Sequence, residues 1–146
     1  MPNNWSIKHD SGYVPDMKIP YELNIFMDSK NEKDCSQFFY SFISKQIPNP
    51  KDVIYEHIER KLDNEGLETL CSYCEEDFHG YRALKYSFSG KLFGAYGRGI
   101  AYAFLHNGHI FLFVNFFVPN ILDGRTEYDV WNKLEILEKG KWKFDF

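Results

Sequence analysis

The stretch Ile100-Ala-Tyr-Ala-Phe-Leu-His-Asn-Gly-His-Ile-Phe-Leu-Phe-Val-Asn-Phe-Phe-Val118 is the most apolar part of this chain, and Asn107-Gly108 lies at its centre. Two apolar arms around Asn-Gly are typical of a β-hairpin, because both central residues of a type I′ turn need a positive φ, which Gly and Asn tolerate. A two-residue loop places His106 opposite His109. The stretch therefore predicts a central pair of antiparallel strands.

Alternation along these strands assigns their side chains to two faces. One face is small and aliphatic, which suits the close approach of a helix, and carries Ala101, Ala103, Leu105, Ile110, Leu112 and Val114. The other face is aromatic and carries Tyr102, Phe104, Phe111 and Phe113, and we expect Tyr86 and Phe88 to extend it from a neighbouring strand. Either helices cover both faces, or the aromatic face receives a partner; the sequence leaves both alternatives open.

The composition is that of one globular domain over residues 1–146, with 44% hydrophobic and 26% charged residues. A net charge of -4 without a basic cluster argues against nucleic acid as a partner. The N-terminus has no apolar signal-peptide core, and no apolar run reaches transmembrane length, so we expect a cytoplasmic protein without membrane insertion. The three cysteines, Cys35, Cys71 and Cys74, fit reduced thiols.

The rest of the chain predicts further strands and three helices around this hairpin. Strands are expected over residues 5–9, 19–27, 67–73 and 81–88, with another from residue 91 or 92, interrupted by glycines, into the hairpin. Helical spacing predicts helices over residues 33–46 and 126–139, and Asn49-Pro50 predicts the capped start of another that ends near Gly66. Trp142, Phe144 and Phe146 alternate with polar residues and predict a closing strand. The expected class is α+β, an antiparallel four-stranded meander with N-terminal strands and flanking helices.

No motif in the chain predicts catalysis, a metal or a cofactor. His106 and His109 would need a third ligand to hold a metal ion. The CxxC spacing of Cys71 and Cys74 lies in a predicted strand and not at a helix start, which favours structural thiols. The segment Gly94-Ala-Tyr-Gly-Arg-Gly99 matches no phosphate-binding motif, and the acidic run Glu75-Glu-Asp77 is typical of a solvated turn.

The order of the predicted elements, together with a set of local patterns, resembles bacterial DcrB-like proteins of the PsbP-like fold group. The patterns are Glu22-Leu-Asn-Ile-Phe, Ile43-Ser-Lys-Gln-Ile-Pro, Val53-Ile-Tyr-Glu-His-Ile-Glu-Arg-Lys-Leu62, Tyr81-Arg-Ala-Leu, the strand over residues 101–116, and Trp131 followed by Trp142-Lys-Phe144. The resemblance implies an antiparallel sheet flanked by helices, without catalytic machinery. It points to the Eag-type chaperones, which hold the hydrophobic transmembrane segments of type VI secretion effectors.

The residues themselves also favour a binding protein, because the aromatic hairpin face could hold an apolar segment of a protein partner. We expect a non-catalytic adaptor or chaperone with partner-binding residues Tyr86, Phe88, Tyr102, Phe104, Phe111 and Phe113. The alternative is an immunity protein that neutralises a toxin, since a small acidic protein rich in aromatics also suits that role. An uncovered aromatic face, or an edge strand over residues 141–146, would favour a homodimer.

Overall fold

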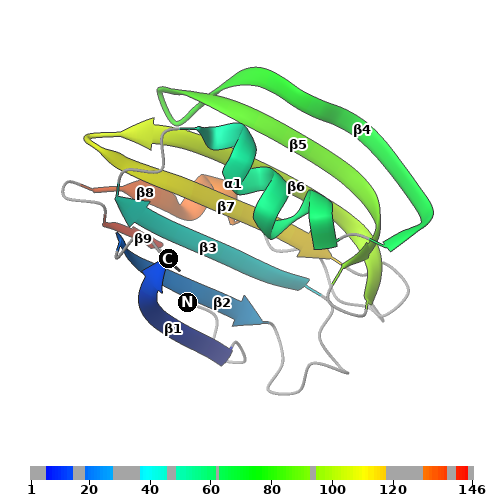
Figure 1. Ribbon diagram of the computed structural model, residues 1–146, viewed down its shortest axis with the longest axis horizontal. Coiled ribbons are helices and arrows are strands. Elements are labelled where there is room, and N and C mark those ends of the chain that lie inside the picture. The colour runs from blue at the N-terminus through cyan, green and yellow to red at the C-terminus, as the bar shows by residue number, and fades with distance from the viewer. Residues whose placement is uncertain are drawn as a thin grey trace.

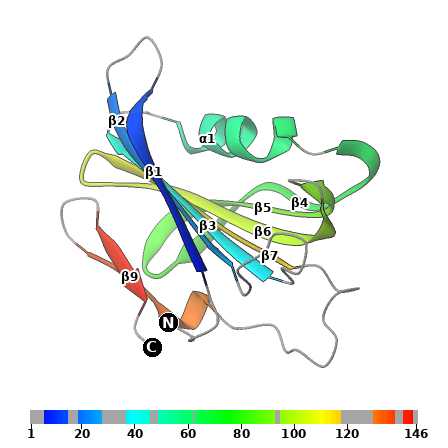
Figure 2. The ribbon, with the colours of Figure 1, turned by 90° about the horizontal axis from the view of Figure 1, so that it is seen from below.

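A computed structural model shows a curved antiparallel sheet with one helix on one face and a small two-stranded sheet on the other (Figures 1 and 2). It describes residues 6–14, 19–27, 37–45, 49–61, 63–92, 95–117, 130–137 and 141–144. Figure 2 shows the resulting three layers, with α1 (Pro50–His57) above the large sheet and β9 (Trp142–Phe144) below it.

The large sheet has seven antiparallel strands in the order β1-β2-β3-β7-β6-β5-β4. Their bounds are β1 Ser6–Val14, β2 Ile19–Met27, β3 Gln37–Lys45, β4 Asp63–Phe78, β5 Tyr81–Leu92, β6 Ala95–His106 and β7 His109–Phe117. Two meanders, β1–β3 and β4–β7, therefore meet where β3 pairs with β7. At this junction the buried Gln37 amide donates to Asn115 Oδ1 at 3.0 Å, a bond that favours one register.

The predicted hairpin is confirmed residue by residue. Asn107 and Gly108 have φ values of 49° and 76°, as a type I′ turn requires. His106 pairs with His109, Tyr102 with Phe113 and Ile100 with Asn115. The four-stranded meander is confirmed as well, although β4 extends to Phe78, so that the acidic run lies in a strand and His79-Gly80 forms the turn.

The helix predicted over residues 33–46 is wrong, because residues 37–45 form the central strand β3. Every β3 residue except Lys45 is buried, since the strand has neighbours on both sides and layers on both faces. A strand buried on both faces has a continuous apolar sequence without alternation, which a buried helix can share. The short length of this segment and its many aromatic residues are the features that favour a strand.

The helix start at Asn49-Pro50 is confirmed, but the helix is shorter than predicted. The Asn49 side chain accepts from the Lys51 amide at 3.0 Å and caps α1. α1 ends at His57, the 3-10 turn η2 (Glu59–Lys61) follows, and residues 63–66 already belong to β4. Val53, Ile54 and Ile58 pack against the aliphatic hairpin face, as that face predicted.

The helix predicted over residues 126–139 is also wrong in its described part. Residues 130–137 hold the 3-10 turn η4 (Trp131–Lys133) and the strand β8 (Leu134–Ile136), and residues 126–129 and 138–139 lie outside the described part. β8 pairs with β9, so the predicted closing strand exists and joins the small sheet. The α+β class is therefore corrected: the described residues form an antiparallel β fold with one α-helix.

The interruption predicted at Gly97 and Gly99 is absent, and rings pack closely over these two glycines instead; Gly94 lies outside the described residues. The pairing of β5 with β6 is continuous from Leu84 to Leu92, without a bulge. A Cβ at Gly99 would lie 2.8 Å from Cε1 of Phe88, and one at Gly97 would lie 2.8 Å from Cζ of Phe116. Phe88 and Phe116 thus lie across β6 at positions where only a hydrogen leaves them room.

Candidate functional site: an apolar furrow between α1 and β2

The predicted aromatic binding face is occupied by the C-terminal segment of the chain itself. Phe104, Phe111 and Phe113 are fully buried. Trp131 of η4 and Trp142 of β9 cover this face, with edge-on ring contacts at 5.1 Å to Tyr102 and 5.5 Å to Phe113. The expectation that this face is open to a partner is not met.

Tyr102 is the member of the predicted site that keeps some exposure. Its ring stacks on Phe78 at 4.4 Å, and its hydroxyl donates to Glu76 Oε2 at 2.8 Å. Burial, and then the hydrogen bond to Glu76, raise the pKa of the Tyr102 hydroxyl. Tyr102 therefore connects the edge of the aromatic core to β4 through these two contacts, and it does not line an open surface.

Tyr86 and Phe88 lie on the opposite face from the one predicted. Directly opposed residues of antiparallel strands share a face, and Tyr86 pairs with Ala101 while Phe88 pairs with Gly99. Both rings are buried in the core below α1. The predicted six-residue site is thus divided between two cores, and the structure does not bring its members together.

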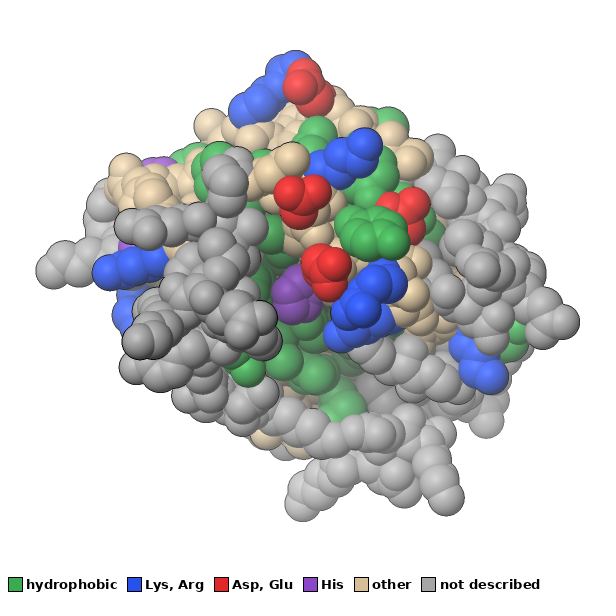
Figure 3. Space-filling model, in the orientation of Figure 1, with side chains coloured by type: hydrophobic (Ala, Val, Ile, Leu, Met, Phe, Trp, Pro, Cys, Tyr) green, Lys and Arg blue, Asp and Glu red, His purple; other side chains and the backbone are tan. Residues whose placement is uncertain are grey.

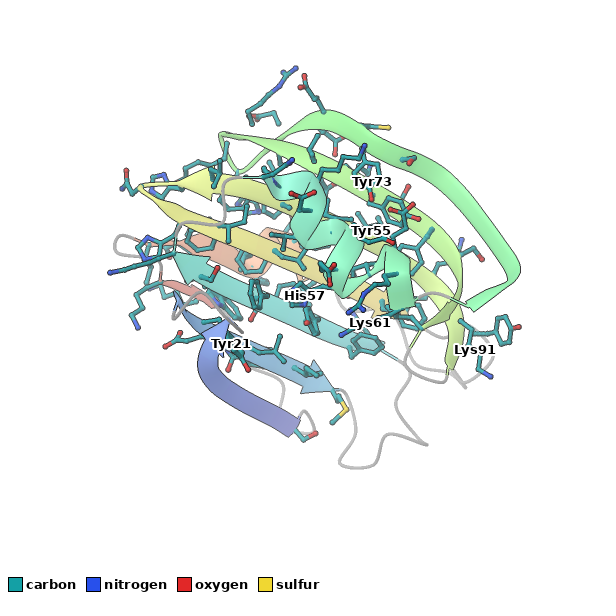
Figure 4. All side chains as sticks on the ribbon, in the orientation of Figure 1. Tyr21, Tyr55, His57, Lys61, Tyr73 and Lys91 are labelled. Atoms are coloured by element: carbon teal, nitrogen blue, oxygen red, sulfur yellow. The ribbon has the colours of Figure 1, made fainter. Side chains whose placement is uncertain are left out.

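The face that stays partly open is the α1 face, on its β2 side. Tyr21, Leu23 and Ile25 alternate along β2 and point to the α1 face, where they pack against its core while remaining half-buried. Figure 3 shows hydrophobic side chains lining a hollow beside the histidine at the centre of the view, and Figure 4 places His57 there. We call this hollow the furrow.

The floor of the furrow is aromatic and its helix wall is polar. The buried side chains of Tyr40 and Phe42 on β3 form the floor, and the Tyr21 ring stacks on Phe42 at 5.7 Å. His57, at the last position of α1, lies over the floor with its ring centroid 4.2 Å from that of Phe42. Helix α1 and the β2–β3 pair thus supply opposite walls of one groove.

His57 is held by one hydrogen bond in an apolar setting. Its Nδ1 lies 2.6 Å from the Tyr40 hydroxyl. Burial lowers the pKa of His57 to about 4, and the positive charges of Lys61 and Arg60 lower it further in the same direction. The imidazole is therefore neutral near pH 7. With Nδ1 engaged, Nε2 is the ring nitrogen left for a hydrogen-bonding group of an occupant.

The other candidate residues form no reactive centre. The His106 ring packs edge-on against Tyr81 at 4.6 Å, and His109 Nδ1 lies 3.1 Å from the Asn107 carbonyl oxygen. Within the described residues, no group of three or more metal-binding side chains is found, and no helix is long and apolar enough to cross a membrane. Cys74 is disulfide-bonded, so the prediction of reduced thiols is wrong for this residue.

Sequence reasoning missed the furrow, although one signal for it was available. Alternation along the strand predicted over residues 19–27 puts Tyr21, Leu23 and Ile25 on one face, and in the structure all three pack against the α1-side core. Their partial exposure depends on where α1 lies, and the sequence does not fix that position. Had α1 packed over β2 instead of over β6 and β7, the same three side chains would be core.

Comparisons with known proteins name no family for this chain. No protein-family model matches it, and no curated protein does. One similar solved structure is that of a Pseudomonas aeruginosa protein of unknown function, with 12% identity, 88% of each chain covered and a TM-score of 0.41. A likeness at this level carries no argument about function.

Proposed function

We propose that this protein is a non-catalytic, cytoplasmic adaptor or chaperone that holds an apolar segment of a partner protein in the furrow. The observation that carries the proposal is the row of Tyr21, Leu23 and Ile25, three large apolar side chains left half-buried beside a fully buried strand. An apolar row of this kind is stabilised further when a partner removes it from water, at about 25 cal/mol per Å².

The construction of the furrow suits a segment that is mostly apolar and has one polar contact. Tyr40 and Phe42 are held within the core, so the floor is formed before binding and little ordering is needed. His57 presents a neutral imidazole on the helix wall, and burying it against a partner requires no charge to leave water. An uncharged hydrophobic segment, such as a transmembrane segment of a type VI secretion effector, is the occupant that this lining suits.

The test uses a defined probe, a fluorescein-labelled Leu- and Ala-rich peptide of about 20 residues with lysines at both ends for solubility. We expect its fluorescence anisotropy to rise on binding to the wild type. Leu23→Asp and Ile25→Asp each place a carboxylate in the furrow and should weaken binding at least about tenfold. Both positions keep part of their surface in solvent, where a carboxylate stays hydrated, and the circular dichroism spectrum of each variant checks that the fold is retained.

Tyr96→Asp is the matched control, since Tyr96 is 50% exposed and shares the opposite sheet face with Tyr102. It should bind the peptide as the wild type does. Equal binding by Leu23→Asp and the wild type would reject the furrow as the site. Failure of the wild type to bind the peptide, combined with tight binding of a folded toxin domain, would favour the alternative role of an immunity protein.

A further inference from the structure

A bulge in the edge strand β4 holds a tyrosine in a backbone conformation that tyrosines avoid. Cys71 pairs with Ser87 and Cys74 pairs with Lys85, so three steps on β4 face two on β5. Within the bulge Tyr73 has a φ of 56°. A positive φ in a bulky residue costs free energy and persists only where the surrounding structure enforces it.

The bulge directs Tyr73 onto α1 and η2. The Tyr73 hydroxyl donates to Glu59 Oε2, and Lys51 Nζ lies 5.0 Å from the centroid of the ring. The same ring contacts Tyr86, part of the core below α1, at 5.4 Å. Figure 4 shows Tyr73 reaching from β4 toward the helix, on the side away from His57. Tyr73 thus ties the far side of α1 to the sheet edge.

Cys74 follows Tyr73 directly, is solvent-exposed and is disulfide-bonded. The other cysteines of the chain are Cys35 and Cys71. Disulfides in the cytoplasm, where we propose that this protein acts, are mostly transient and redox-sensing. Because Cys74 is exposed, a small dithiol can reach its sulfur.

We propose that the Cys74 disulfide is a redox-sensitive latch, which holds the β4 bulge so that Tyr73 fixes α1 and thereby keeps the furrow in its binding shape. The effect on affinity rests on the function proposed above. The effect on α1 does not.

The reaction is an ordinary thiol–disulfide exchange. A thiolate of a dithiol reductant attacks the disulfide, the S–S bond breaks, and a mixed disulfide forms while one protein thiol leaves. The second thiol of the reductant resolves the mixed disulfide. Two electrons pass from the dithiol to the protein, which ends with two thiols, and the dithiol ends as its own disulfide.

Reduction should loosen the helix wall of the furrow. Without the disulfide the bulge can relax, and Tyr73 then returns to an ordinary φ and moves away from Glu59 and Lys51. Helix α1 has eight residues and keeps its place through packing and anchors, because so short a helix is not stable by itself. A less fixed α1 makes the furrow less preorganised and therefore weakens binding.

The first experiment measures hydrogen exchange of the full chain without any ligand, before and after treatment with dithiothreitol. The reporter is the Ile58 amide, which donates to the Ile54 carbonyl oxygen at 2.9 Å at the end of α1. We expect this amide to exchange about fivefold or more faster in the reduced protein, while β6 and β7 amides exchange unchanged. Equal exchange of the Ile58 amide in both redox states would overturn the latch.

Two variants assign the effect to the bulge. Cys74→Ser should exchange like the reduced wild type and ignore dithiothreitol, and because residue 74 is exposed the fold should tolerate serine. Tyr73→Gly removes the strain and the anchor together, so it should lose the redox response while its disulfide remains intact. Tyr96→Ser is the control, an exposed tyrosine of β6 on the sheet face opposite α1, whose loss should leave the redox response in place. A redox response that persists in Tyr73→Gly would exclude Tyr73 as the anchor and reject the latch.

The second experiment repeats the peptide titration with oxidised and reduced wild type. We expect affinity to fall about fivefold on reduction, a change of about 1 kcal/mol. Equal affinities would reject redox control of the furrow. If neither form binds the peptide while the Ile58 amide still responds to dithiothreitol, the proposed function fails and the latch on α1 stands.

Discussion

Both faces of the large sheet carry many aromatic side chains, but the two faces differ in how completely the rest of the chain covers them. On one face Phe104, Phe111 and Phe113 are sealed below two tryptophans from the C-terminal segment. On the other, α1 covers β6 and β7 and leaves the side chains of β2 half-buried. The difference shows that an aromatic face is not by itself a binding face. What decides is whether the chain supplies its own cover.

Among the tests of this contrast, we expect the largest loss of stability from Phe111→Ala. Removing a fully buried ring from the sealed face should cost about 3–5 kcal/mol of unfolding free energy, because the surrounding rings cannot collapse into the cavity. Leu23→Ala on the half-open face should cost clearly less, since Leu23 leaves a groove and not a closed cavity. Urea unfolding followed by tryptophan fluorescence measures both. Equal losses would mean that the two faces are equally closed.

The pH dependence of stability tests whether His57, on the helix wall of the furrow, is buried. Its pKa is lowered to about 4 in the fold, so the unfolded state takes up the proton first. Stability is fully present above about pH 6.5 and falls as the pH drops toward 4, by up to about 3 kcal/mol. His57→Gln should remove this part of the pH dependence.

Urea unfolding at several values between pH 7 and 4 gives the comparison. Carboxylates titrate alike in the wild type and in His57→Gln, so the difference between the two profiles isolates His57. If the two profiles of stability against pH were parallel, His57 would be solvated, and the helix wall of the furrow would be open to water.

We expect the smallest loss of stability from a substitution at Gly99, which lies in the fully buried part of the α1 face. Gly99→Ala places a methyl group against the Phe88 ring, which is fully buried and cannot move aside, so we expect a loss of about 1–3 kcal/mol. In the background of Phe88→Leu the same substitution should cost less, and a double-mutant cycle measures that coupling. Additive losses would mean that the ring does not lie over Gly99.

Local chemistry predicted the elements whose cause is local. The Asn107-Gly108 turn determined the register of β6 with β7, and Asn49 determined where α1 begins. Both follow from backbone conformations that a few neighbouring residues impose. Alternation along β2 likewise accounts for the shared face of Tyr21, Leu23 and Ile25.

Tertiary placement caused the errors. Burial on both faces removes from β3 the alternation that identifies a strand. Phe38, Phe39, Phe42 and Ile43 then recur at a spacing that also predicts a helix. The predicted face of Tyr86 and Phe88 is wrong because the register of β5 with β6 is set by pairing over a long strand and not by a turn motif. Alternation in β2 identifies the apolar row but does not predict the furrow, since the furrow exists only where α1 stops covering the sheet.

The junction of β3 with β7 bears on the order in which the molecule assembles. Strands β4 to β7 are consecutive in the chain and follow one another across the sheet, so each pairing closes a short loop. Phe39 and Asn115, by contrast, are partners across a long stretch of chain. Because distant contacts are entropically costly to form, we expect the C-terminal meander to form first and the β1–β3 meander to dock onto it late. The furrow spans that junction, so binding competence should be the last property that a newly made chain acquires.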